Sequence, residues 1–69
     1  GTKGISFQST NYNDYLRFKM ALTQSGFKAT KFAKENNSLH EYYINSNYKA
    51  NIWVLKKPTI YEMSIDIPK

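Results

Sequence analysis

The sequence contains no cysteine, which excludes a disulfide framework and a thiolate zinc site as sources of stability. At 69 residues the chain is near the lower size limit for a domain without such cross-links. Its stability must therefore come from side-chain packing. A protein without cysteine also suits a reducing compartment, and we expect a cytoplasmic location.

Long apolar runs are missing as well. No stretch approaches the ~20 apolar residues of a membrane helix, and no basic segment leads into an apolar signal core. We therefore expect no membrane association. We expect residues 1–69 to form one domain, with residues 1–4 disordered or foreign to the natural chain.

Motifs for catalysis or cofactor binding are absent from the sequence. Its three glycines are scattered and make no phosphate-binding loop. Its five acidic residues show no paired spacing for acid–base catalysis or for a hard metal ion. We therefore expect no enzymatic activity, no metal and no cofactor.

The single histidine, His40, is the one side chain that would ordinarily titrate near neutral pH. Over residues 16–44, a helix that ends at Gly26 and a following strand that carries His40 are similar to the HicA-type mRNA-cleaving toxins. Those toxins have a Gly-Ser/Thr-His step and a closing helix, whereas this chain has Ser38-Leu39-His40 and an expected final strand. The resemblance implies a third interpretation of function, a small ribonuclease that uses His40. Glu41 is adjacent to His40, and adjacent strand residues point to opposite faces, so the two are poorly placed to act as a catalytic pair.

Acidic residues are few beside basic ones. Ten Lys and Arg against five Asp and Glu give a net charge of +5. Such a charge predicts attraction to nucleic acid or another anionic partner, although solubility alone would also explain it.

Aromatic residues, in contrast, are abundant, with six Tyr, four Phe and one Trp. Two aromatic and β-branched runs flank an Asn-Ser-Asn-Tyr cluster within Ser38–Lys57, which predicts a β-hairpin. Neither run alternates cleanly, because Tyr42-Tyr43 and Ile52–Leu55 would place apolar side chains on both faces. Either a second layer covers the far side of the sheet or that side meets a partner.

The remaining pattern predicts an α+β fold in which one helix packs on one face of a largely antiparallel four- to five-stranded sheet, in the order β-α-β-β-β-β. A helix over Asp14–Ser25 would bury Tyr15, Phe18 and Leu22. The expected strands are Ile5–Ser9, Phe27–Lys34, the two hairpin runs and Ile60–Ile67. The predicted inward side chains of the strands are Ile5, Phe7, Phe27, Ala29, Ala33, Tyr61, Met63, Ile65 and Ile67.

Basic residues and aromatic rings interleave in the second half of the chain. Lysines that meet phosphates beside rings that stack on bases are the parts of a single-strand binding surface. The sequence therefore predicts a small nucleic-acid-binding module that prefers single strands. The alternative is a protein-binding, inhibitory or homodimerising module that uses the same sheet face. The candidate binding residues are Lys28, Phe32, Lys34, Tyr42, Tyr43, Tyr48, Lys49, Trp53, Lys56 and Lys57.

Overall fold

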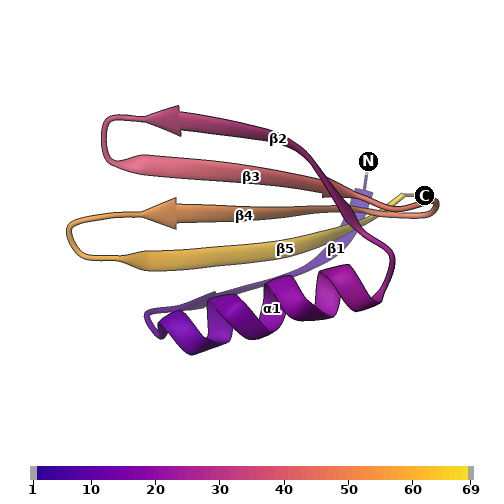
Figure 1. The fold of residues 1–69 in the computed structure, drawn as a ribbon, viewed down its shortest axis with the longest axis horizontal. Helices are drawn as coiled ribbons and strands as arrows, with labels where there is room; N and C mark the ends of the chain where they lie inside the picture. The colour runs from indigo at the N-terminus through magenta and orange to yellow at the C-terminus, as the bar shows by residue number, and fades with distance from the viewer. Residues whose placement is uncertain (1, 69) are drawn as a thin grey trace.

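The computed structural model describes the backbone of residues 2–68 and the side chains of residues 4–66. Five antiparallel strands form one sheet in the order β1-β5-β4-β3-β2, and one helix packs against it (Figure 1). This is the predicted α+β fold. The elements are β1 (Thr2–Ser9), α1 (Tyr12–Gln24), β2 (Lys28–Glu35), β3 (Ser38–Ile44), β4 (Lys49–Leu55) and β5 (Ile60–Pro68).

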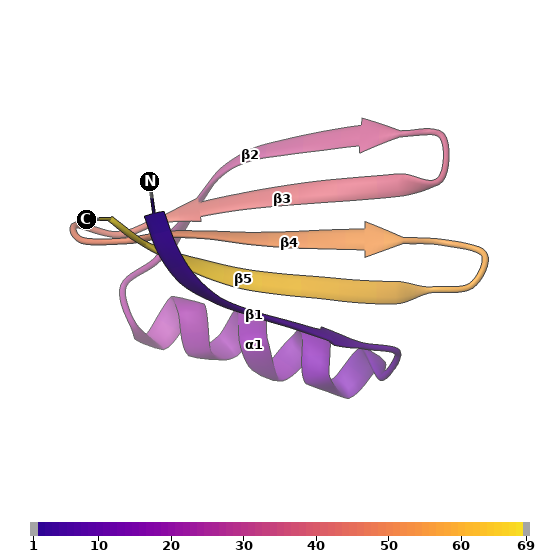
Figure 2. The same ribbon diagram turned by 180° about the vertical axis from the view of Figure 1, so that it is seen from behind.

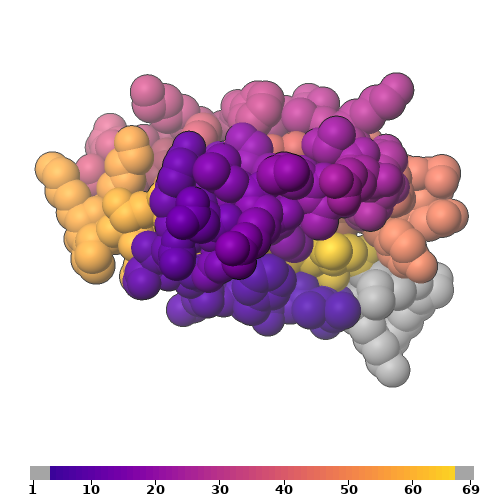
Figure 3. All heavy atoms as spheres, turned by 60° about the horizontal axis from the view of Figure 1, so that its bottom comes forward, coloured from indigo at the N-terminus to yellow at the C-terminus, as the bar shows by residue number. Residues whose placement is uncertain are grey.

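Strands β2 to β5 form the predicted meander, and β1 pairs with the last of them along Thr2↔Pro68 to Ser9↔Tyr61. The chain therefore leaves one edge of the sheet at β1, passes through α1 and returns at the other edge as β2. Figure 2 shows the sheet from behind, with α1 beyond β1. In the space-filling view, α1 lies over the middle of the molecule with β1 beneath it (Figure 3).

Local signals set both ends of α1. The Asn11 side chain accepts a hydrogen bond from the Asn13 backbone N–H at 2.8 Å, as an N-cap does. Gly26, with φ +81°, takes the left-handed conformation that ends a helix. The helix has 13 residues, and no helix within residues 2–68 is long and apolar enough to cross a membrane.

The core lies between α1 and the sheet. Leu22 is 2% exposed, and Ile52 and Met63 beneath it are 0% and 1% exposed, which confirms the predicted inward face of the helix. The prediction that Ile5 and Phe7 are buried is wrong, since they are 61% and 45% exposed. Both point to the helix side, but β1 is an edge strand with no neighbour beyond it. Ile67, also predicted inward, lies outside the residues whose side chains are described.

Strand β4 has two apolar faces, as predicted. Ile52 and Val54 are buried on the helix side, whereas Trp53 between them is 43% exposed on the opposite side. The register of β3 with β4 likewise places Tyr43 opposite buried Ala50, and Tyr42 opposite Asn51 on the other side. The described residues form one helix and one sheet. Within them, no second layer covers the outward side chains, Trp53 and Tyr42.

The predicted faces of β2 are wrong beyond residue 29. The register shifts between Ala29 and Lys31, as in a β-bulge. Phe32 therefore lies opposite Glu41 on the helix side, and Ala33 lies opposite His40 on the other side. The extra residue exchanges the two faces of the strand after residue 29, so Ala33, which was predicted to face the helix, faces the opposite side.

Candidate functional site

The side of the sheet opposite α1 is here called the far face. Cross-strand pairing arranges its side chains in rows. One row runs Ala33, His40, Trp53, Glu62 and Gln8, and the next runs Lys31, Tyr42, Asn51, Ser64 and Ser6. A third contains Lys28, Ile44, Lys49 and Asp66.

Three rings stack at the centre of this face. The His40 ring lies 4.2 Å from the Tyr42 ring and 5.6 Å from the Trp53 ring, with interplanar angles of 23° and 5°. The Tyr42 hydroxyl lies 3.1 Å from His40 Nδ1. We call Tyr42, His40 and Trp53 the ring column. The column is partly exposed, since Trp53 is 43% exposed and His40 and Tyr42 are half-buried.

The turn between β3 and β4 sets the register that builds the ring column. Asn45 Oδ1 accepts hydrogen bonds from the backbone N–H groups of Asn47 and Tyr48, at 2.8 and 2.7 Å. The Asn45 backbone N–H also donates to the Tyr48 carbonyl at 3.0 Å. The closed turn fixes the pairing of His40 with Trp53. A one-residue slip would send Trp53 to the core side of the sheet.

Charges on the far face are unevenly distributed. On the β2 side, Lys31 Nζ lies 5.9 Å from the centre of the Tyr42 ring, and Lys28 stands further along the same strand. On the β5 side, Glu62 is opposite Trp53, and Asp66 is opposite Lys49. Apart from Glu35 at the end of β2, the face therefore changes from basic at β2 to acidic at β5.

Two shallow hollows adjoin the ring column. One, of about 450 Å³, is lined by Trp53, His40, Asn51, Glu62, Ser64 and Gln8 among others. The second, of about 510 Å³, is lined by Lys31, Tyr42, Ile44, Lys49, Asn51 and Asp66 among others. Asn51 lines both, so the hollows adjoin across the sheet. Each combines an aromatic side chain with hydrogen-bonding groups, which suits a flat polar ring.

The structure separates the ten predicted binding residues into three groups. Those on the far face are Lys28, Tyr42, Lys49 and Trp53. Those on the helix side are Phe32, Lys34 and Tyr43, of which Tyr43 is buried in the core. Those at turns are Tyr48, Lys56 and Lys57. The predicted binding set omitted Lys31, Asn51 and Glu62, and it named His40 only as the catalytic residue of a ribonuclease, because the positions of all four on the far face depend on the pairing register.

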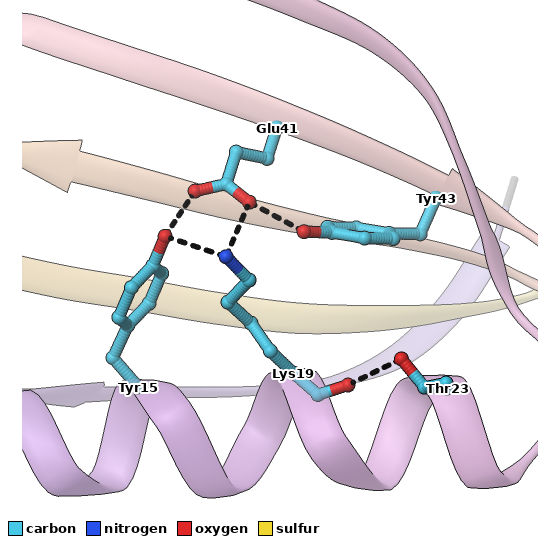
Figure 4. Close-up of polar contacts among 5 residues, drawn as sticks. All are labelled: Tyr15, Lys19, Thr23, Glu41 and Tyr43. Atoms are coloured by element: carbon cyan, nitrogen blue, oxygen red, sulfur yellow. Dashed lines mark hydrogen bonds and ion pairs between the residues drawn. The ribbon is translucent and has the colours of Figure 1, made fainter.

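A buried polar cluster lies on the helix side, under α1 (Figure 4). Glu41 is 1% exposed and accepts hydrogen bonds from the hydroxyls of Tyr15, at 2.5 Å, and Tyr43. Lys19 Nζ lies 3.8 Å from the same carboxylate. Burial raises the pKa of both tyrosine hydroxyls, and the hydrogen bonds to Glu41 and its charge raise them further. The cluster ties α1 to β3, which is a structural role.

His40 and Glu41 lie on opposite faces of β3, as their adjacency predicted. No group of three or more His, Cys, Asp or Glu side chains that could hold a metal ion occurs in the part of the chain that the structure describes. Comparison with models of known protein families, with curated proteins and with solved structures finds no match. The ring column and its charged surroundings are therefore the basis for assigning a function.

Proposed function

We propose that the protein is a non-catalytic module that binds single-stranded nucleic acid on the far face of its sheet. The observation that carries this proposal is the ring column beside Lys28, Lys31 and Lys49. Exposed rings stack on bases of any sequence, and neighbouring lysines neutralise phosphates. The site would be accessible to nucleic acid in the cytoplasm, where we place the protein.

The charge distribution favours one orientation of the strand. Phosphates would lie over the basic side of the face, near Lys28 and Lys31, and away from Glu62 and Asp66. Bases would then extend toward the ring column and the two hollows. Duplex DNA would fit poorly, because its bases are already stacked on one another.

Substitution of Trp53 tests the proposal. Because Trp53 is 43% exposed, Trp53→Ala should remove stacking surface without unfolding the domain. Stacking contributes about 1–3 kcal/mol per base, so we expect about 5- to 150-fold weaker binding of a fluorescent oligouridine, measured by anisotropy at ~50 mM salt. Phe32→Ala is the matched control, since Phe32 is 60% exposed but lies on the helix side, and we expect it to leave binding unchanged.

Absence of oligonucleotide binding by the wild-type protein at ~50 mM salt would refute this function. Equal losses in the two variants would refute the assignment of the face. Sedimentation of the protein alone provides the second arm. A Trp53-dependent dimer without nucleic-acid binding would favour the alternative, in which the same face meets a protein.

A further inference from the structure

The hollow beside Trp53 contains a carboxylate that has no partner among the described side chains. Glu62 lies between Trp53 of β4 and Gln8 of β1 on the far face, and its side chain lines the hollow. Among the side chains of residues 4–66, none donates a hydrogen bond to its carboxylate or forms an ion pair with it. Both oxygens can therefore accept hydrogen bonds from a ligand that stacks on Trp53.

The chemistry of the four bases selects among such ligands. A carboxylate is an acceptor with two oxygens, so it matches two neighbouring donors. Guanine alone presents two, N1–H and the N2 amino group, side by side on its Watson–Crick edge. Adenine and cytosine place a ring acceptor beside their amino group, and uracil places its one donor between two carbonyls. Each of those acceptors would repel a carboxylate oxygen.

We propose that this hollow is a guanine-selective subsite of the nucleic-acid-binding face, an inference that rests on the proposed function. The base stacks on Trp53 and donates from N1 and N2 to the Glu62 carboxylate. The amide of Gln8, which also lines the hollow, donates to O6. The acidic side of the face thus receives a base with two donors rather than a phosphate.

The probes are four oligouridines that differ at one central position, which carries guanosine, inosine, adenosine or uridine. We expect guanosine to bind about tenfold or more tightly than uridine, as one bidentate contact provides. Inosine lacks the N2 amino group and should fall between them. The adenosine strand should bind more tightly than the uridine strand only by the greater stacking of adenine on Trp53.

Glu62→Gln replaces one acceptor oxygen by a donor, and we expect it to abolish the preference for guanosine while all-uridine binding stays equal or becomes tighter. Glu35→Gln is the matched control, because it removes the same charge from the far face at the end of β2, three strands from β5. It should retain the preference. Binding of the all-uridine strand also shows that each variant is folded.

Equal affinities of the wild-type protein for the guanosine and uridine strands would overturn the subsite, as would a preference that survives Glu62→Gln. In either case Trp53-dependent binding of all-uridine strands would leave the proposed function standing. If no strand binds, the proposed function fails and the subsite fails with it.

Discussion

At the scale of single residues, the position of Glu41 shows how a charged side chain can be buried in so small a core. A buried carboxylate is costly unless hydrogen bonds and a cation compensate for its lost hydration. Glu41 has two tyrosine hydroxyls and Lys19 as partners. Removing a single partner leaves the charge in place with less compensation.

We therefore expect Tyr43→Phe to lower the free energy of unfolding at pH 7 by about 1–3 kcal/mol, the cost of an unmet buried hydrogen bond. Tyr42→Phe is the control, because it removes the same hydroxyl from the neighbouring residue on the far face, where water can replace the contact with His40. Urea denaturation measures both. Equal losses would show that the Glu41 cluster does not stabilise the fold.

The raised pKa values of Tyr15 and Tyr43 predict a loss of stability at high pH. Above about pH 10 the unfolded chain releases these two protons while the folded protein retains them, so the free energy of unfolding falls as pH rises. Below pH 10 the contribution is fully present. We expect the fall above pH 10 to be shallower in Tyr43→Phe than in the wild type, as measured by melting temperatures from pH 8 to 11.5. Parallel curves would contradict this.

Some of these residue positions could be predicted from sequence and others could not. The burial of Leu22 was predictable because the spacing of Tyr15, Phe18 and Leu22 places all three on one side of the helix. The burial of Glu41 was not, because two of its three partners, Tyr15 and Lys19, come from α1 and only the fold brings them to β3. The positions of His40 and Glu62 beside Trp53 were likewise not predictable, because they depend on the pairing register.

At the scale of secondary-structure elements, α1 closes one face of the sheet mainly through Leu22. We expect Leu22→Ala to cost about 2–5 kcal/mol, because it leaves a cavity above Ile52 and Met63. Leu16→Ala is the matched control, since Leu16 is 37% exposed on the same helix, and we expect about 1 kcal/mol or less. Thermal unfolding followed by circular dichroism would distinguish the two, and similar midpoints would contradict the assigned face of α1.

The edge strand β2 carries two features that oppose pairing with another chain. An unpaired edge invites association, and lysines and β-bulges prevent it. β2 carries Lys28, Lys31 and Lys34 and shifts register between Ala29 and Lys31. The sequence predicted the strand itself, but no glycine or proline marked the bulge, so its faces were assigned with the wrong alternation.

We expect replacement of Lys28, Lys31 and Lys34 by Thr to promote self-association at high protein concentration, as measured by sedimentation velocity. The control replaces Arg17, Lys56 and Lys57, which removes the same charge from α1 and a turn. A monomeric triple β2 variant, or equal association of the two proteins, would show that these lysines do not protect the edge.

At the scale of the whole molecule, the net charge is +5, and the fold distributes the lysines over the far face, the helix side and a turn. Lys28, Lys31 and Lys49 stand on the far face with the ring column. Lys34 points to the helix side, and Lys56 and Lys57 lie in the turn between β4 and β5. The net charge and the high aromatic content could be predicted from the sequence alone. Which lysines and which rings share a surface depends on the register of the sheet.

The most direct test of this account is the salt dependence of oligonucleotide affinity in two matched variants. For a single strand, each lost phosphate contact reduces the slope of log K against log salt by about 0.7. Replacing Lys28, Lys31 and Lys49 by Gln should therefore reduce the slope by about two, whereas replacing Lys34, Lys56 and Lys57 by Gln, with the same change in net charge, should reduce it much less. Equal slopes in the two variants would show that net charge, and not the far face, attracts the nucleic acid.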